Sequence, residues 1–413
     1  MTDSTTEQVP PSPETGGAAP QLPRTREQPA PEKSDQLARR SKRYQRCKLA
    51  LGITEWAVEM LLLIGLLASG GTTALRDLAG RFSANAWAIV LLYLIPIGLL
   101  FTLVSMAFSA TRTFLVDRRF GLSTASFGVW LADQLKGMAL GGFFWLAGIE
   151  ILYALLRHFP NAWWIWAGIA FSLIFVLLAQ LAPILIFPLF YRFTQITDSE
   201  ITGRLERLAA RAGTRIRGVF EVNLSRKTRA ANAALVGFGR TRRILLADNL
   251  LDNFTLDEIE TVLAHEFAHH TQHHLPKAVA IQTATFFLLF YGIHVVLRGV
   301  GDHWGLRGAA DIAALPLVAL AGTVLGLVLL PLTNGLLRHF ERNADGYALN
   351  VATHPRAFCS ALLRLAQINL ADRYPNRLVE WIFYTHPSVG SRIERSEKIL
   401  SERDGRAGKR NNV

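Results

Sequence analysis

The chain has 413 residues, about half of them hydrophobic, and a formal net charge of +12 at pH 7. This apolar content is high for a soluble enzyme and predicts a membrane protein. The basic residues flank apolar stretches instead of lining one face, which indicates orientation in a membrane and argues against a nucleic-acid partner. Cys47 and Cys359 are the only cysteines and lie far apart, which excludes a disulfide framework and a cysteine zinc site.

Residues 1–47 are predicted to form a disordered tail, because residues 1–36 hold seven prolines among polar residues. They lack the apolar segment and the positively charged start of a signal peptide. Six lysines and arginines between positions 39 and 48 precede the first apolar stretch, and an excess of such residues keeps a segment in the cytoplasm. A second, short basic tail is expected over 404–413.

Four apolar stretches follow, at about 49–70, 86–108, 137–156 and 163–190, and they predict an N-terminal transmembrane bundle over 48–192. The second stretch has no charge over 23 positions, which is enough to cross a hydrocarbon layer of ~30 Å. Three carboxylates within these stretches are expected to face the interior of the bundle, because charge is costly in hydrocarbon. They are Glu55, Glu59 and Glu150.

The chain is expected to leave the membrane over 193–276. Thr197 and Glu200 predict a capped helix that ends at Gly213. The segments 219–224, 231–237 and 242–248 are predicted to be short strands, the last two joined as a hairpin. Such a sheet offers an edge to which an extended peptide can add as a strand, although an ordinary core strand explains the second of these patterns, 231–237, equally well.

Residues 255–274 read TLDEIETVLAHEFAHHTQHH and contain the motif H-E-x-x-H. Thr255 and Glu258 form a capping box before apolar residues at helical spacing, which predicts a helix. His265 and His269 then share one face and can bind one metal ion, while Glu266 lies where the attacking water needs a base. The other histidines of the segment break this spacing and are predicted to be solvated or interfacial: His270, His273 and His274.

Two further apolar stretches, at about 278–297 and 312–337, predict a transmembrane hairpin over 277–338. The segment FERNADGYA then brings the chain back to the same side of the membrane as the two histidines, and in it Glu341 and Asp345 stand four residues apart. A C-terminal catalytic part is expected over 339–403. A catalytic zinc needs a third protein ligand, for which Glu341 is the candidate. Asp345 can accept the second ring N–H of a ligand histidine. Taken alone, the pair is better explained as solvated carboxylates at a helix start.

Six separated segments together resemble the integral-membrane M48 metallopeptidases, specifically the CAAX prenyl protease 1 family. They run in the same order from about residue 86 to 400 and comprise 114–137, 183–196, 232–248, HEFAH, ERNAD and YTHPSVGSRI. The resemblance implies a mainly α fold, a polytopic helical membrane bundle of about six or seven spans. It also implies a gluzincin-like cytoplasmic zinc protease domain that contains a small β-sheet.

The resemblance extends to individual site residues. Asn232, Ala233 and Ala234 match a segment that binds the substrate, and His386 and Arg392 match positions near the active site. Either of the last two could stabilise the oxyanion of a tetrahedral intermediate. The implied reaction is cleavage near the C-terminus of prenylated CAAX proteins. The expected partners are therefore membrane lipids and a peptide or protein substrate that is lipidated or membrane-associated.

The expected protein is a multi-pass membrane zinc metalloendopeptidase whose site faces the cytoplasm. One Zn²⁺ is held by His265, His269 and Glu341, Glu266 is the general base, and Asp345 orients a ligand histidine. Three alternatives remain. They are an HtpX-like quality-control protease, a non-proteolytic membrane chamber or chaperone with a closed four-ligand structural zinc, and a soluble metalloprotease, which the long apolar stretch at 86–108 disfavours.

Overall fold

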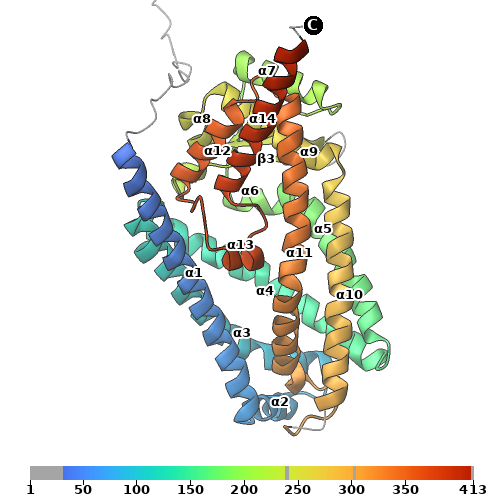
Figure 1. The fold of residues 1–413 in the computed structure, drawn as a ribbon. Coiled ribbons are helices and arrows are strands. Elements are labelled where there is room, and N and C mark those ends of the chain that lie inside the picture. Colours follow the sequence, from blue (N-terminus) through green and yellow to red (C-terminus); the bar gives the residue numbers. More distant parts are fainter. Residues whose placement is uncertain (1–30, 238–240, 301–303, 411–413) are drawn as a thin grey trace, which may run out of the picture.

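The computed structural model describes residues 31–237, 241–300 and 304–410. Six helices in these ranges are long and apolar enough to cross a membrane, and they lie at the predicted stretches. They are built on α1 (Pro31–Ala68), α3 (Ala86–Ala110), α4 (Phe127–His158), α5 (Trp163–Leu181), α10 (His274–Val300) and α11 (Leu315–Val351). Figure 1 shows α1, α10 and α11 running along the length of the molecule. The predicted helical membrane bundle is therefore confirmed.

The polar half of the molecule is the sheet together with the helices around it, at one end of the bundle (Figure 1). Its helices are α7 (Ser199–Arg211), α8 (Asp248–Asn253), α9 (Leu256–Thr271), α12 (Ala357–Ile368), α13 (Arg377–Phe383) and α14 (Val389–Arg410). Short elements follow or connect the spans: α2 (Gly71–Phe82), η1 (Thr111–Asp117), η2 (Ala182–Ile186), α6 (Phe187–Phe190) and η5 (Ile312–Ala314). One more, η3 (Leu224–Arg226), lies between two strands of the sheet.

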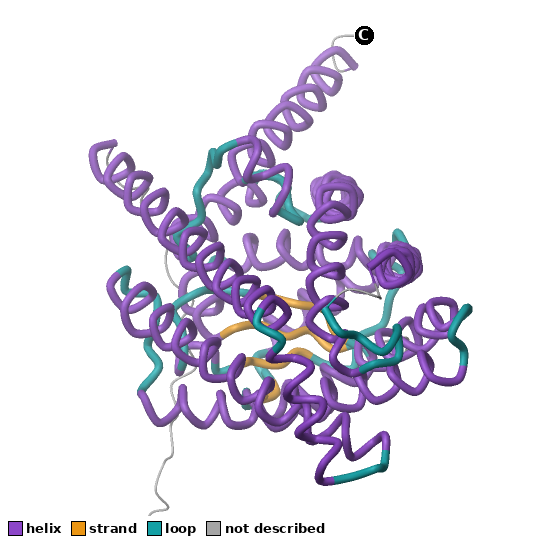
Figure 2. The backbone as a smooth tube through the Cα atoms, turned by 90° about the horizontal axis from the view of Figure 1, so that it is seen from below, coloured by secondary structure: helices purple, strands orange, loops and turns teal. Residues whose placement is uncertain are grey.

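The sheet has four strands in the order β1-β2-β4-β3, where β1 is Phe193–Gln195, β2 is Val219–Val222, β3 is Ala233–Val236 and β4 is Arg243–Ala247. Figure 2 shows these strands enclosed by helices. β3 pairs antiparallel with β4, as the predicted hairpin requires, and β2 pairs parallel with β4. The three predicted strands are present, whereas β1 was not predicted because three residues carry too little periodicity. β3 is an edge strand.

Residues 1–30 of the expected disordered tail lie outside the described residues, whereas residues 31–47 are helical and not disordered. The reason is a set of tertiary contacts that the local composition does not reveal. The buried Tyr44 ring packs edge-on against Phe120 at 5.3 Å between centroids, and its hydroxyl donates to Asp117 Oδ1 at 2.9 Å. Gln45 Nε2 donates to the Leu370 carbonyl at 2.8 Å. The first helix is therefore fixed to the polar half before it enters the membrane region.

The cap of α7 also differs from the expectation. Asp198, not Thr197, is the N-cap residue, and its carboxylate accepts hydrogen bonds from the backbone N–H groups of Glu200 and Ile201. Aspartate is among the best N-cap residues, and this choice moves the helix start by one position. The helix end matches the expectation, because Gly213 adopts a φ of +64°.

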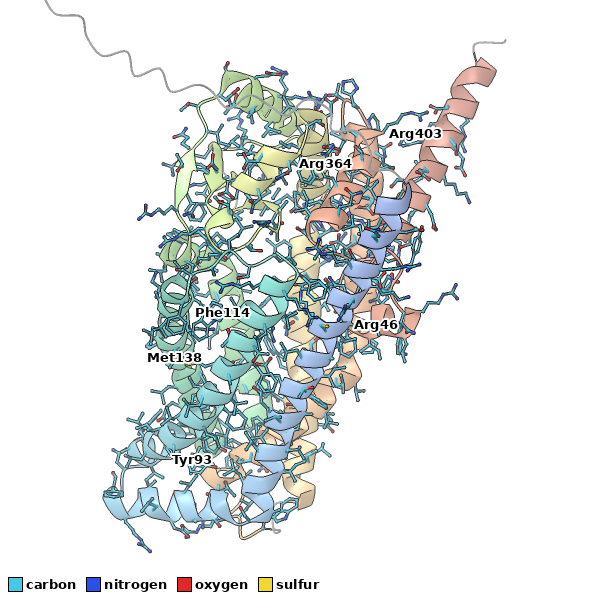
Figure 3. The ribbon with its side chains drawn as sticks, turned by 90° about the vertical axis from the view of Figure 1, so that its left-hand side faces the viewer. Arg46, Tyr93, Phe114, Met138, Arg364 and Arg403 are labelled. Carbon is cyan, nitrogen blue, oxygen red and sulfur yellow. The ribbon has the colours of Figure 1, made fainter. Side chains whose placement is uncertain are left out.

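The described residues form two large hydrophobic cores, besides the small cluster around Tyr44 and Phe120. One lies in the polar half and centres on α9, where Ile259, Leu263 and Phe267 are fully buried. The other lies in the bundle around Tyr93 and Trp163, both fully buried. Figure 3 shows Tyr93 towards the end of the bundle that is remote from the polar half. The position of α9 is therefore set by a core of its own.

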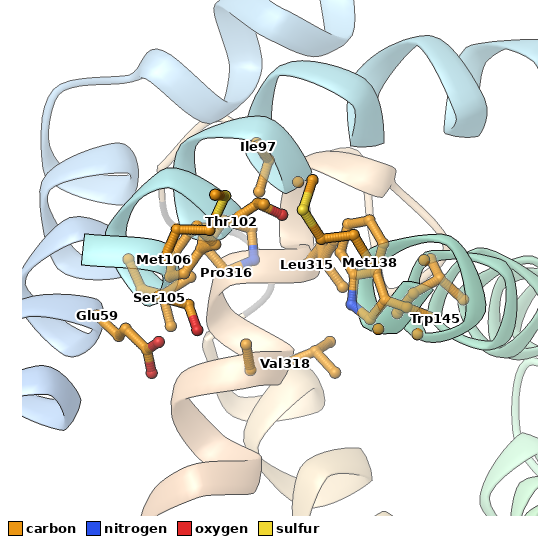
Figure 4. A pocket seen from close by; sticks show the side chains of 18 of the residues that line it. Glu59, Ile97, Thr102, Ser105, Met106, Met138, Trp145, Leu315, Pro316 and Val318 are labelled. Carbon is orange, nitrogen blue, oxygen red and sulfur yellow. The ribbon is translucent and has the colours of Figure 1, made fainter. Parts of the chain in front are cut away.

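A cavity of about 600 Å³ lies inside the bundle among α1, α3, α4 and the start of α11. Its wall is mainly apolar and includes Met138 and Trp145, with the carboxylate of Glu59 among its few polar groups (Figure 4). Glu59 thus faces the interior, as expected, while Glu55 accepts a hydrogen bond from Arg112 at 2.7 Å.

Glu260 connects α7, α9 and the segment after α11. Its side chain is almost fully buried, pairs with Arg204 and Arg211, and accepts hydrogen bonds from the backbone and hydroxyl of Thr353 at 3.0 and 2.7 Å. Burial favours the protonated form, but the hydrogen bonds from Thr353 and the charge of Arg204 outweigh it and lower the pKa of Glu260 to about 2.

Glu260→Gln is expected to lower the free energy of unfolding by about 2 kcal/mol, because it removes a buried charge that three groups satisfy. A depressed pKa stabilises the fold fully above the unfolded value of about 4.3, and this stabilisation is lost as the pH falls towards 2. The difference in Tm between wild type and variant, measured in detergent, should therefore shrink from about pH 5 to about pH 3. A pH-independent difference would contradict this assignment.

Candidate metal centre

The helix α9 positions the two motif histidines. Its capping box is present as predicted, with the Thr255 hydroxyl accepting from the Glu258 N–H and the Glu258 carboxylate accepting from the Thr255 N–H. His265 is buried and His269 is partly exposed at the surface of a cavity. Their Nε2 atoms lie 3.4 Å apart and point at a common position.

Glu341 completes a three-residue cluster with these histidines. It lies on α11 and returns from the membrane region without a break in the helix. Glu341 Oε2 is 3.2 Å from His265 Nε2, and Glu341 Oε1 is 3.5 Å from His269 Nε2. Tetrahedral coordination with bonds of about 2.05 Å places ligand atoms about 3.3 Å apart, so these separations fit one small cation.

The chemistry of these donor atoms fits a cation as well. Glu341 Oε2 is buried and has no hydrogen-bond partner among the described residues, and an unsatisfied buried carboxylate oxygen is costly. The Nε2 atoms of His265 and His269 face each other beside this oxygen, and such a pair of imidazole nitrogens forms a poor hydrogen bond. The three residues form a group that could hold a metal ion, although their role as ligands stays a prediction.

Asp345 lies one turn after Glu341 and contacts the far side of His265. Its Oδ1 is 2.9 Å from His265 Nδ1, which favours a proton on Nδ1. The lone pair of Nε2 is then free to bind a metal ion at the cluster. Arg392 in turn holds Asp345 with two hydrogen bonds, at 2.6 and 2.9 Å. The chain of contacts therefore fixes both the tautomer and the orientation of one predicted ligand.

The electrostatics of the cluster favour bound positive charge. Burial opposes a charged His265, but the hydrogen bond to Asp345 and the carboxylate of Glu341 outweigh it and raise the pKa of His265 to about 9. Burial and the neighbouring His265 lower the pKa of His269 to about 4, so this imidazole stays neutral. Burial raises the pKa of Glu266, which suits a group that must both accept and release a proton.

Glu266 lines a cavity that adjoins the cluster. This cavity has a volume of about 330 Å³ and is lined by Glu266, His269 and Glu341 together with Leu235 and Val236 of the edge strand. The predicted base, two of the predicted ligands and the predicted peptide-binding strand thus share one space. A peptide lying along β3 would pass beside Glu266.

The backbone of β3 is arranged to accept a further strand. The Asn232 carbonyl accepts from Ala247 N at 3.0 Å, and in an antiparallel ladder the groups of Ala233 and Leu235 then point away from β4. The Leu235 carbonyl is approached by His270 Nε2 at 3.3 Å, while the Asn232 side chain accepts from the Ala233 N–H at 2.9 Å. The role of Asn232, Ala233 and Ala234 in binding substrate stays a prediction.

His386 and Arg392 occupy different positions relative to the cluster. His386 Nε2 lies 3.3 Å from Glu341 Oε2, and its side chain is 58% exposed, so it can reach a bound substrate. Arg392 directs two of its donors at Asp345 and lines another cavity on the other face of α11. Its contacts are those of a residue that positions Asp345. A direct contact with substrate stays a prediction for both residues.

His274 was not predicted as part of the site. It was expected to be solvated or interfacial, yet it is buried, its Nδ1 lies 3.2 Å from His269 Nδ1, and its ring stacks on Phe340 at 4.8 Å. The turn between α9 and α10 brings it back, because His273 adopts a left-handed φ of +57°. Helical periodicity cannot reveal a contact that depends on such a turn.

Asp345→Asn is expected to weaken zinc binding by about 10- to 100-fold, because the amide no longer provides the negative charge that holds the His265 tautomer. Competition with a chromogenic chelator measures this affinity. Asp252→Asn is the matched control, because Asp252 is exposed on α8 and away from the cluster, and it should leave zinc affinity unchanged. Unchanged zinc affinity in Asp345→Asn would show that Asp345 does not orient the ligand.

Comparison with known proteins agrees with the geometry of the site. The model of peptidase family M48 matches residues 195–400, about half of the chain. A second model, described as the CAAX prenyl protease N-terminal region with five membrane helices, matches residues 21–192. The described residues of that region contain four candidate spans. The additional helix there, α2, has only 12 residues and is too short to cross the membrane.

Several curated proteins are similar along most of their length. The uncharacterized metalloprotease YhfN of Bacillus subtilis is 28% identical over 68% of this chain and 67% of its own. CAAX prenyl protease 1 of Saccharomyces cerevisiae is 27% identical over 71% and 68%, and its homolog in Oryza sativa is 27% identical over 79% and 77%.

The crystal structure of S. mikatae Ste24p has the same fold, with a TM-score of 0.79, 22% identity and coverage of 88% of this chain and 89% of that one. A metal ion is expected in this peptidase family, and His265, His269 and Glu341 form a group that could hold one. Together with the six apolar helices, these matches decide the assignment. The chain belongs to peptidase family M48 and is a multi-pass membrane metalloendopeptidase.

Proposed function

We propose that the chain hydrolyses peptide bonds with one zinc ion held by His265, His269 and Glu341. The observation that carries this proposal is the convergence of three side chains whose nearest donor atoms lie 3.2 to 3.5 Å apart, beside the half-buried carboxylate of Glu266, which is not one of them. When bound, zinc supplies Lewis acidity, which makes water a better nucleophile near neutral pH and polarises the scissile carbonyl.

The remaining steps belong to the side chains. Glu266 takes a proton from the attacking water and later gives it to the leaving amine, which its raised pKa favours. Asp345 holds His265 in the tautomer that directs Nε2 at the cluster. His386, near Glu341, can donate to the oxygen that becomes negatively charged in the transition state. The outer edge of β3 aligns the peptide by main-chain hydrogen bonds, which would replace the contacts that His270 and the Asn232 side chain make there.

We further propose that the substrate is a protein with a prenylated cysteine near its C-terminus. Relatives named CAAX prenyl protease 1 support this substrate class. The cavity of about 600 Å³ inside the bundle supports it as well, because its mainly apolar wall suits a hydrocarbon chain (Figure 4). The basic residues between positions 39 and 48 favour a cytoplasmic position for the polar half and thus for the site.

Substrate profiling tests this proposal. Peptides with a C-terminal CAAX sequence, prenylated or not, are supplied to the purified protein in detergent or nanodiscs. The prenylated peptide is expected to show a kcat/KM at least about tenfold higher, because the lipid adds binding energy remote from the scissile bond. The Glu266→Gln variant gives the background rate. Equal rates for both peptides would favour a protease that trims membrane proteins without regard to prenylation.

A further inference from the structure

A second cavity, of about 380 Å³, lies on the other face of α11 from the metal centre. Five arginines line it, from α11, α13 and α14: Arg338, Arg342, Arg377, Arg392 and Arg395. Only two carboxylates, Asp345 and Glu380, line it with them. The wall of this arginine cavity therefore carries an excess of three positive charges, and nothing in the proposed hydrolysis uses this excess.

Only two of the five arginines in the arginine cavity form hydrogen bonds or ion pairs with the described residues. Arg392 is paired with Asp345, and Arg338 donates to the Glu380 and Tyr384 carbonyls at 3.1 and 2.5 Å. The Glu380 carboxylate accepts from the Ser388 N–H at 2.8 Å. The other three arginines form no hydrogen bond or ion pair with any residue that the structure describes: Arg342, Arg377 and Arg395. Three guanidinium groups thus share one cavity without an ion-pair partner among the described residues.

The arginine cavity lies where α11 leaves its uncharged segment, which is the expected depth of the lipid headgroups for a helix that spans a membrane. The segment 315–337 of α11 contains no charged residue, Arg338 is the first charge after it, and Arg342 follows about 6 Å further along the helix. Figure 1 shows α13 lying across the molecule between α1 and α11, and Asn334 Nδ2 fixes it to α11 by donating to the Ile382 carbonyl at 2.7 Å.

The helix α13 exposes apolar side chains next to these arginines. Leu378 is 61% exposed, Trp381 55% and Phe383 42%, and Trp381 also lines the arginine cavity. A short helix that presents tryptophan, phenylalanine and leucine beside arginine is typical of an element embedded in the membrane surface. These apolar groups would contact acyl chains, which a free anion lacks.

We propose that the arginine cavity binds the phosphate headgroup of an anionic phospholipid, with its acyl chains against Leu378, Trp381 and Phe383. Guanidinium groups bind phosphate oxygens in a bidentate geometry, and basic pockets beside transmembrane helices bind anionic headgroups. Because Arg392 lines this cavity and contacts both Asp345 and His265, a lipid bound here would adjoin the residues that orient this predicted ligand. The binding does not depend on the proposed proteolysis.

Native mass spectrometry of the full-length protein tests the proposal by a binding readout. The protein is released from membranes that contain phosphatidylcholine and phosphatidylglycerol, and the retained lipid is counted. We expect each protein molecule to retain one phosphatidylglycerol in preference to phosphatidylcholine. A variant with Arg342, Arg377 and Arg395 all changed to Gln should lose this preference by about tenfold or more, because each basic residue near an anionic surface contributes substantially.

A matched control carries the same change of charge elsewhere in the polar half. Arg207, Arg215 and Arg226 are exposed, form no hydrogen bond or ion pair with the described residues and lie outside the arginine cavity, so changing all three to Gln should leave the preference intact. Trp381→Ala should weaken retention of phosphatidylglycerol without any change of charge. An unchanged Tm in detergent shows that each variant is folded.

Three results would overturn the proposal. Equal loss of lipid in both triple variants would mean that overall charge, not the arginine cavity, retains the lipid. Displacement of phosphatidylglycerol by excess inorganic phosphate, with no effect of Trp381→Ala, would mean a site for a free anion. If the cavity variant instead lost a preference for peptides with a free α-carboxylate over their amides, at unchanged lipid retention, the ligand would be the substrate.

Discussion

Glu266→Gln is expected to lower kcat for peptide hydrolysis by at least about 10³-fold while zinc stays bound. Glutamine has the same shape, but it cannot take a proton from the attacking water. Glu266 is not part of the three-residue cluster, so the donor atoms of His265, His269 and Glu341 are unaffected. A quenched-fluorescent peptide assay measures kcat, and elemental analysis gives the zinc content.

The same substitution at Glu206 is the control, because Glu206 is exposed on α7 and away from the cavity. It should leave both kcat and zinc content at the level of the wild type. If Glu266→Gln kept most of its activity, another group would have to be the base. If it lost zinc along with activity, Glu266 would contribute to the metal site itself.

Glu341→Gln is expected to weaken zinc binding by more than about 100-fold, a larger effect than for a residue that only orients a ligand. The substitution keeps the shape of the side chain but removes the buried negative charge that lies 3.2 Å from His265 Nε2. Zinc content after dialysis against a chelator should fall to that of the protein stripped of metal, and added zinc should restore activity only at high concentration.

The contrary outcome for Glu341→Gln is specific. Zinc affinity equal to that of the wild type would mean that Glu341 is not the third ligand. The next candidate would be His386, whose Nε2 lies 3.3 Å from Glu341 Oε2, and His386→Ala would then lose the metal. If Glu341 is the ligand, His386→Ala should keep zinc and reduce kcat only. The pair of variants therefore separates a ligand from a group that contacts the substrate.

The sequence predicted the elements that depend on neighbouring residues. The H-E-x-x-H helix has its capping box and apolar spacing within 20 residues, and it folds as expected. The spans follow from long uncharged stretches, since hydrocarbon cannot satisfy polar groups. The pairing of β3 with β4 follows from two short apolar segments that are close together in the sequence.

Other features depend on which segments meet in space. Residues 31–47 are helical because Tyr44 reaches Asp117 and Phe120, and His274 returns to His269 because His273 turns left-handed. The three residues of β1 form a strand only because they pair with β2. The arginine cavity is likewise assembled from three helices. Neither composition nor periodicity contains this information.

By itself, the sequence determined which residue types were available for metal chemistry and that two histidines share one helix face, because helix geometry is local. It offered Glu341 and Asp345 as candidates by type and spacing, and the resemblance gave them roles. Only the tertiary structure brought Glu341 to within 3.5 Å of both histidines and turned Asp345 towards His265 Nδ1. The physical reason is that packing of α9 against α11 joins distant segments, and burial of apolar surface, not local preference, sets that packing.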